Sequence, residues 1–153
     1  MPASRYSERR GRSPRLDLGP TGDTSIARTV VAALLVLAGI AWLAVYVGAG
    51  GPGSDGGSLA WMSDLGSWNY VIGFGAIFVG LAIAAHRSTP LGRGRGVVIG
   101  MLGCFLIGLL WIILYYIAGS TLTLPLITDL GQYNLVVGIG FMAVGFVYAT
   151  HWE

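Results

Sequence analysis

The chain has 153 residues, of which 54% are hydrophobic and only 10% are charged. This balance is too apolar for a soluble domain of this length. All nine basic residues are arginine and six of them lie within the first 28 positions. The formal net charge of +2 therefore indicates how the chain is oriented in a membrane, and it does not indicate a nucleic-acid partner.

The first 28 residues form a tail of Ser, Arg, Pro, Gly and Asp with few large apolar side chains. Such a segment cannot bury enough surface to offset its conformational entropy, so we predict a disordered tail. Residues 29–48 contain the uncharged run VVAALLVLAGIAWLAVYV, which at ~1.5 Å per residue crosses most of a ~30 Å hydrocarbon layer. A cleaved signal peptide is the competing interpretation, but the long polar lead-in favours an uncleaved membrane anchor.

Three further apolar blocks follow. A loop rich in Gly and Ser leads to a second predicted span at residues 68–85, and residues 88–96 form a polar, basic linker. The third and fourth spans are predicted at residues 97–118 and 133–150. The sequence therefore predicts an all-α membrane protein with four transmembrane helices.

The arginines predict the orientation of these spans. They occur in the tail and in the stretch HRSTPLGRGRG, whereas the other two loops contain none. The positive-inside rule then places both termini and the linker in the cytoplasm. The GRGRG run is interpreted as an orientation signal that contacts anionic lipid, in preference to an RNA-binding segment.

The chain contains an internal repeat. A shift of 65 residues places DLGSWNYVIGFGAIFVGLAIAAH over DLGQYNLVVGIGFMAVGFVYATH, and the preceding spans agree at a shift of 69. Because each unit contains two spans, both units enter the membrane in the same direction. We therefore predict two parallel tandem helix hairpins, at residues 29–87 and 97–153, joined by the linker at residues 88–96.

Small residues recur at helical spacing in the second and fourth spans. They are Ala76, Gly80 and Ala84 in one span, and Gly140, Gly145 and Ala149 in the other. In lipid, small side chains allow helix backbones to approach closely, so we predict that these residues form a packing face on each span, either within the protein or towards another protein. The residues predicted to take part in helix packing are Gly39, Trp42, Gly80, Ala84, Gly108, Trp111, Gly145 and Ala149.

The motif Asp-Leu-Gly-x-(Trp/Tyr)-Asn lies at the outer end of each of these two spans. Asn69 and Asn134 are expected to cap the helix start, with Gly66 and Gly131 supplying the turn before it. The neighbouring aromatic residues lie where a membrane-interface belt is expected, so anchoring and partner recognition both remain open. The candidate anchor or partner motif comprises Trp61, Gly66, Trp68, Asn69, Tyr70, Gly131, Tyr133 and Asn134.

No arrangement of residues indicates catalysis or cofactor binding. His86 and His151 have no further ligands at metal-binding spacing, so interfacial placement is favoured over a metal site. The predicted spans contain no Asp, Glu, Lys or Arg, which disfavours a proton relay or ion pathway. We therefore expect a protein that is not an enzyme and that binds neither a metal nor a cofactor.

The segment LAWMSDLGSWNYVIGFGAIFVGLAIAAHR, preceded by GIAWLAVY, resembles the actinobacterial CrgA cell-division family. These are small membrane proteins with a basic, disordered amino terminus and two spans. The resemblance covers residues 29–87 well and residues 97–153 more loosely. The family is ordinarily a single hairpin, and the second unit here has Tyr133, Asn134 and Leu135 in place of Trp-Asn-Tyr.

The resemblance implies a septation protein of the plasma membrane, enriched at the septum, that binds divisome components, affects the FtsZ ring and helps to recruit cell-wall synthases by contact alone. The matching outer-face positions are Trp61, Gly66, Trp68, Asn69 and Tyr70. Homo-oligomerisation is left open. The alternatives are a subunit of a small-solute transporter or channel, and an accessory subunit of a single membrane enzyme.

Overall fold

The computed structural model describes residues 25–49, 60–121 and 124–151. Most of the predicted disordered tail and parts of both outer loops lie outside these ranges. The described residues contain no strand. Their elements are α1 (Ile26–Ala49), α2 (Ala60–Leu65), α3 (Trp68–Ala84), the 3-10 turn η1 (Pro90–Gly92), α4 (Arg95–Thr121), α5 (Pro125–Leu130) and α6 (Tyr133–Ala149).

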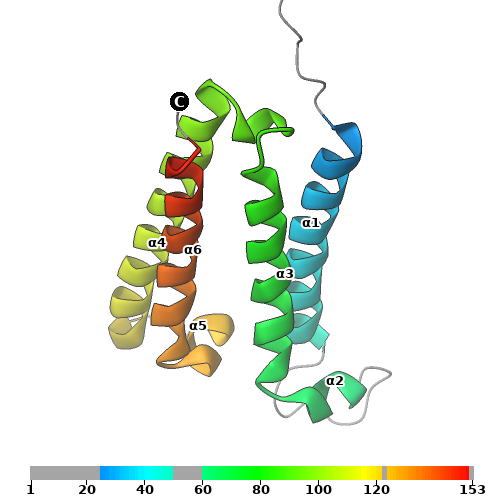
Figure 1. The fold of residues 1–153 in the computed structure, drawn as a ribbon. Helices are drawn as coiled ribbons and strands as arrows, with labels where there is room; N and C mark the ends of the chain where they lie inside the picture. The colour runs from blue at the N-terminus through cyan, green and yellow to red at the C-terminus, as the bar shows by residue number, and fades with distance from the viewer. Residues whose placement is uncertain (1–24, 50–59, 122–123, 152–153) are drawn as a thin grey trace, which may run out of the picture.

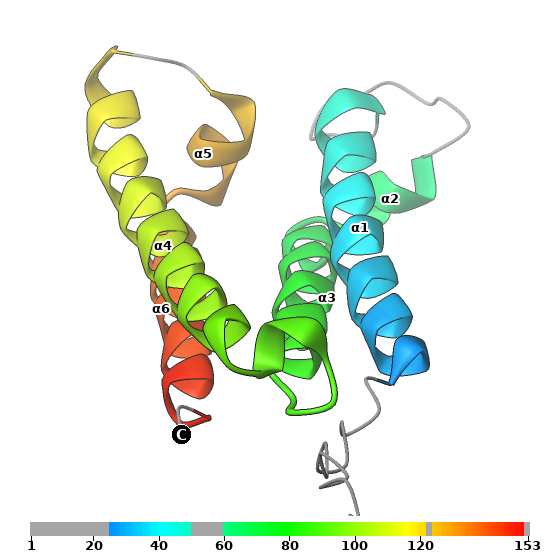
Figure 2. The ribbon, with the colours of Figure 1, turned by 90° about the horizontal axis from the view of Figure 1, so that it is seen from above.

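The helices form two hairpins of the same design (Figure 1). In the first unit α1 lies against α3, and in the second unit α4 lies against α6. A short helix, α2 or α5, precedes the second long helix of each pair. Figures 1 and 2 show α2 and α5 at one end of the molecule, with η1 and the start of α1 at the other. We call these the α2/α5 end and the η1 end.

The helix bounds lie close to the predicted spans. α3 and α6 begin at the predicted residues, Trp68 and Tyr133, while α1 begins three residues before its predicted start. The helices α1 and α4 are long and apolar enough to cross a membrane, and α3 and α6 are shorter apolar helices. Only 22% of the most apolar window of α1 and of α4 is buried. Most of their apolar surface therefore faces outward, unlike that of a helix in a soluble core.

Glycine sets the distance between the helices of each hairpin. A Cβ atom placed on Gly39 would lie 2.5 Å from the carbonyl oxygen of Gly73, and one placed on Gly108 would lie 2.6 Å from that of Gly138. Neither position has room for a side chain, because a backbone atom of the neighbouring helix occupies the space. The repeat therefore preserves one backbone crossing in both units.

The glycines of the predicted small-residue face divide between two roles. Gly80 lies against Ala32 and Val36 of α1, and Gly145 occupies the equivalent place against α4. Gly140, by contrast, faces the ring of Phe78 in the other unit. The prediction of one packing face containing Gly140 and Gly145 was therefore wrong, because these two glycines contact different helices. Ala84 and Ala149, at the ends of α3 and α6, are partly exposed.

The linker between the units is compactly folded. The buried hydroxyl of Thr89 lies within hydrogen-bonding reach of the carbonyl oxygens of Ala84 and His86, and it accepts from the amide of Gly92 at 3.2 Å. Gly92 and Gly96 lie so close to neighbouring backbone atoms that a Cβ atom would clash. The turn therefore connects α3 to α4 over a short path.

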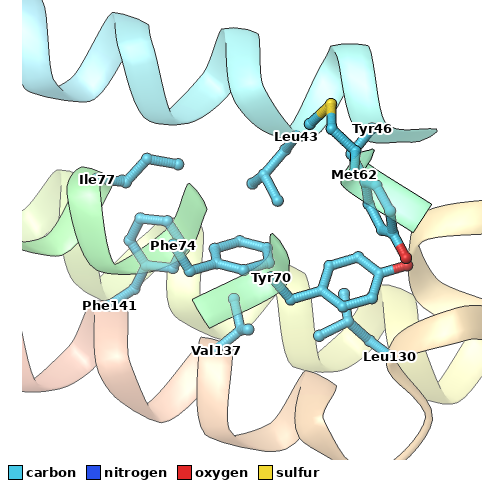
Figure 3. Packing of buried hydrophobic residues seen from close by; sticks show 9 residues of the cluster. All are labelled: Leu43, Tyr46, Met62, Tyr70, Phe74, Ile77, Leu130, Val137 and Phe141. Atoms are coloured by element: carbon cyan, nitrogen blue, oxygen red, sulfur yellow. The ribbon is translucent and has the colours of Figure 1, made fainter. Parts of the chain in front are cut away.

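Two apolar clusters join the units. The larger one contains Tyr70, Phe74 and Ile77 of the first unit with Val137 and Phe141 of the second (Figure 3). The smaller one lies towards the η1 end. Its buried members are Ala85, Val97, Cys104, Val144 and Tyr148.

Candidate functional site

The two asparagines of the repeated motif make the same contacts in each unit. The Nδ2 atom of Asn69 donates to the carbonyl oxygens of Met62 at 2.6 Å and of Gly66 at 3.0 Å. Asn134 donates to the carbonyl oxygens of Ile127 at 2.7 Å and of Gly131 at 2.8 Å. Both side chains are fully buried. Each asparagine thus fastens the short helix to the first turn of the long helix that follows.

The expectation that these asparagines cap the helix start was wrong. The N-cap residues are Ser67 and Gln132, and neither makes a capping hydrogen bond through its side chain. Asn69 and Asn134 are the second residues of α3 and α6, and they donate to carbonyl groups that precede them in the chain. The sequence placed the motif at the helix start, but it could not reveal the short helices whose carbonyl groups need donors.

The glycines of the motif make the turn that this geometry requires. Gly66 and Gly131 both have φ of 50°, a backbone region that residues with a side chain rarely adopt. The turn redirects the chain from the short helix into the long one. It therefore explains why glycine occurs at the same offset from asparagine in both units.

The aromatic residues of the motif divide into exposed and buried groups. Trp61, Trp68 and Tyr133 are exposed at the α2/α5 end, and Trp61 also stacks edge-to-face on Trp42 at 5.7 Å between ring centroids. Tyr70 is buried, with its ring edge-to-face with Tyr46 at 5.2 Å. The structure therefore places Tyr70 inside the molecule and leaves the other three available to lipid headgroups or to a partner.

Three aromatic residues at intervals of four on α3 contact the second unit; we call Tyr70, Phe74 and Phe78 the aromatic ridge. The Tyr70 hydroxyl donates to Asp129 Oδ2 over 3.5 Å. Phe74 lies edge-to-face with Trp111, with ring centroids 5.7 Å apart. The ridge therefore meets α4 and α5 of the second unit through a hydroxyl and a ring contact.

Phe78 fills a space above a glycine. Its ring centroid lies 5.1 Å from that of Phe141, and its ring carbon Cζ is 2.6 Å from where a Cβ atom on Gly140 would be. A side chain at position 140 would therefore displace the ring. We call the second-unit surface that receives the ridge the acceptor surface; it consists of Asp129, Val137, Gly140, Phe141 and Val144.

The two units contribute different surfaces to the contact between them. Val144 on the acceptor surface is 7% exposed, whereas its repeat equivalent Val79 is 53% exposed. The equivalents of Tyr70 and Phe74 are Leu135 and Ile139, which are 39% and 51% exposed. Within the described ranges, the first unit therefore presents a ridge and the second receives it, with no reciprocal contact. In the terms used for oligomers this interface is heterologous.

At the η1 end the first unit has a polar contact that the second does not reproduce. Arg28 Nη1 lies 3.1 Å from His86 Nδ1 and donates to the hydroxyl of Ser88 at 3.0 Å. The repeat equivalent of Arg28 is Val97, and His151 bonds instead to its own helix, at the carbonyl oxygen of Val147. His86 therefore connects α1 to the chain that follows α3, whereas His151 contacts only its own helix end among the contacts described.

Within the described ranges, no three His, Cys, Asp or Glu side chains come together. Cys104 is buried in the smaller apolar cluster. What the described residues offer is surface for contact: exposed aromatic rings, small residues, and the carboxylates of Asp64 and Asp129.

Comparison with known proteins gives two matches along the chain. The family model described as cell division protein CrgA matches residues 1–87 and again residues 84–153. The chain belongs to the CrgA cell division family. It contains two CrgA units in tandem, as the internal repeat predicted.

Individual relatives agree with this membership. A protein of Streptomyces avermitilis named cell division protein CrgA is 43% identical over 66 residues, which is 43% of this chain and 75% of the relative. A protein of Corynebacterium aurimucosum with the same name is 36% identical over 75 residues, 46% of this chain and 80% of the relative. Each relative thus corresponds in length to about one unit. No solved structure matches the chain.

Proposed function

We propose that this chain is a non-enzymatic membrane scaffold of cell division, which acts by contact with other proteins of the septum. The observation that carries the proposal is the double CrgA match, because both relatives described above are named as cell division proteins. In this proposal α1, α3, α4 and α6 all cross the plasma membrane. The termini and η1 lie in the cytoplasm, and α2 and α5 lie at the outer surface.

The distribution of apolar surface supports a membrane location. Large hydrophobic side chains are exposed along α1, α3, α4 and α6, including Leu37, Val71, Leu106 and Val136. Exposed apolar surface on this scale is unfavourable in water and favourable in lipid. The helices α3 and α6 have 17 residues each, which is at the lower end of the ~17–25 residues that span a bilayer.

The signal-peptide alternative is disfavoured by the place of α1 in the fold. α1 lies along α3 through the Gly39–Gly73 crossing and contributes Leu43 and Tyr46 to the larger apolar cluster. Removing α1 would expose that cluster. The equivalent helix α4 makes the same crossing in the second unit, which supports a permanent role for both.

The interior supports a scaffold over a transporter or channel subunit. The rings of Tyr70, Phe74 and Phe141 pack with Ile77 and Val137 in one buried apolar cluster between the units (Figure 3). Among the described residues, the buried side chains of Asn69, Thr89 and Asn134 donate to backbone carbonyl groups. The buried polar atoms without a partner there are scattered over separate positions: Oδ1 of both asparagines, the indole nitrogens of Trp42 and Trp111, and the Tyr148 hydroxyl. A solute pathway needs polar groups that face a continuous opening.

A fluorescent fusion expressed in an actinobacterial cell that lacks the native gene tests the proposal. We expect the fusion to concentrate at the septum and the deletion strain to show altered septum spacing. Removal of only the second unit, with the chain ending after residue 87, separates the contributions of the two units. A uniform membrane signal together with unchanged septa in the deletion strain would contradict a division role.

The partners within this proposal are divisome membrane proteins, and the exposed residues Trp61, Trp68 and Tyr133 are candidate contacts for them. Photocrosslinking from positions 68 and 133 in living cells would identify the proteins that each unit touches. We expect different partners from the two positions, because the units present different residues next to the shared glycine and asparagine.

A further inference from the structure

The first unit has its own copy of the acceptor surface, and no element of the described ranges packs on it as the ridge packs on the second unit. By the repeat register, Asp129, Val137, Gly140, Phe141 and Val144 correspond to Asp64, Ile72, Gly75, Ala76 and Val79. On α3, Ile72, Gly75, Ala76 and Val79 lie on one helical face, at intervals of three and four residues. This free acceptor surface faces away from the second unit, because the aromatic ridge occupies the other side of α3.

The described contacts show that the surface is open. A Cβ atom added to Gly75 would meet nothing within 4 Å, whereas one added to Gly140 would meet the ring of Phe78. Ile72 and Val79 are exposed, although Val144, the equivalent of Val79, is buried. The carboxylate of Asp64 is exposed and has no hydrogen bond or ion pair with the described part of the chain.

The filled acceptor surface shows what such a surface binds. On the second unit it receives a helix that presents a tyrosine hydroxyl to the carboxylate and a phenyl ring to the glycine, eight residues apart. The glycine and the carboxylate are present in the free copy as Gly75 and Asp64. Ala76 replaces Phe141, which leaves more room beside Gly75 for an incoming ring.

We propose that the free acceptor surface of the first unit binds a transmembrane helix of another protein. That helix presents a tyrosine at the level of Asp64 and phenylalanine side chains one and two helical turns deeper in the membrane. The proposal rests on the membrane location described under the proposed function, and it specifies the chemistry of one partner contact.

A second copy of this chain does not fit the requirement. Its first-unit ridge is already buried, since Tyr70 and Phe74 lie against its own second unit. Its second unit carries Leu135, Ile139 and Ala143 at the ridge positions, which supply neither a hydroxyl for Asp64 nor a ring for Gly75. The second unit therefore has no ridge to offer to another copy of the chain. A helix that binds the free acceptor surface has to come from a different protein.

A peptide helix provides a defined probe for this surface. Full-length protein, labelled with a donor fluorophore, is reconstituted in liposomes with an acceptor-labelled peptide of residues 66–87, which carries the complete aromatic ridge. We expect saturable energy transfer. The apparent affinity for the peptide should fall at least tenfold with Gly75→Leu, and severalfold with Asp64→Ala.

Two controls separate recognition from general helix association. Gly103→Leu changes a glycine of α4 whose added Cβ atom also meets nothing within 4 Å, and it should leave binding unchanged. A peptide with Tyr70→Leu, Phe74→Ile and Phe78→Ala, the residues of the second unit, should fail to bind. Unchanged thermal unfolding of the Gly75→Leu protein would confirm that the fold is retained.

Equal energy transfer for the wild type and the Gly75→Leu variant, or for the two peptides, would overturn the proposal. So would self-association of the labelled chain without peptide that Gly75→Leu abolishes, because the occupant would then be a second copy. The liposome measurement does not depend on septal localisation. Its failure is therefore distinguishable from failure of the proposed division role.

Discussion

The two units share a backbone but differ in the surfaces that they present. The glycine crossing and the asparagine contacts are repeated almost to the ångström: a Cβ atom on Gly39 or Gly108 would lie 2.5 or 2.6 Å from a carbonyl oxygen. The outward positions of α3 and α6 have diverged, with Tyr70, Phe74 and Phe78 in one unit and Leu135, Ile139 and Ala143 in the other. The comparison therefore separates the residues that hold the helices of a hairpin together from those that determine which helix packs against it.

The largest effect is expected at the shared crossing. Gly39→Leu and Gly108→Leu each force a side chain against a backbone oxygen of the facing helix. Overpacking of this kind costs ~3 kcal/mol or more, because backbone atoms cannot rotate away. Both variants should lower the unfolding free energy in detergent by similar amounts, measured by steric trapping.

Gly103→Leu is the matched control for this pair, because open space surrounds that position on α4. It should change the unfolding free energy by less than ~1 kcal/mol, with the gain in helix propensity included. A Gly39→Leu variant as stable as Gly103→Leu would show that the hairpin does not depend on the crossing.

The next effect is expected where the units meet. Phe78→Ala removes the ring that covers Gly140 and contacts Phe141, and should cost ~2–3 kcal/mol at this partly exposed site. The distribution of distances between spin labels on α1 and α4 should broaden in the same variant. Phe146→Ala, at a ring that is largely exposed on α6, should leave the distance distribution unchanged.

The asparagine contacts test the equivalence of the units. Asn69→Ala leaves the carbonyl oxygens of Met62 and Gly66 without their side-chain donor, and a buried unsatisfied group costs ~1–3 kcal/mol. Asn134→Ala should cost the same within error. Ser67→Ala is the control, since the Ser67 side chain makes no capping bond. Unequal costs in the two units, read from denaturant titrations, would break the comparison.

The smallest effect is expected for the hydroxyl of the ridge. Tyr70→Phe removes only the 3.5 Å contact to Asp129 and should cost ~0.5–1 kcal/mol. A double-mutant cycle with Asp129→Ala should show a coupling energy of the same size. Tyr133→Phe, whose ring is exposed, should be neutral. A coupling energy of zero would show that the packing of rings alone holds the units together.

The sequence predicted the helices and the repeat because both depend on local signals. Long uncharged runs predicted α1 and α4, and the aligned glycines and asparagines predicted tandem units, which the family matches confirm. Gly66 and Gly131 were correctly expected to make turns.

The contact between the units could not be predicted, because it depends on how the two hairpins are placed. Phe74, Phe78 and Phe141 were not singled out, and Asp129 was noted only as the first residue of the repeated motif. The signal that could have found them is the set of positions at which the aligned units differ, since Tyr70, Phe74 and Phe78 are replaced at intervals of four residues on one helical face. Likewise, the short helices α2 and α5 contain only six residues each, too few for a periodic pattern to be recognised.

Cysteine accessibility tests most directly the central claim that both units cross the membrane in the same sense. In a Cys104→Ser background, single cysteines replace Ser7 in the tail, Leu91 in η1 and Thr128 in α5, and intact cells are treated with a membrane-impermeant maleimide. Thr128→Cys should be labelled in intact cells, and Ser7→Cys and Leu91→Cys only after permeabilisation. Labelling of Leu91→Cys in intact cells while Ser7→Cys stays protected would contradict the tandem arrangement.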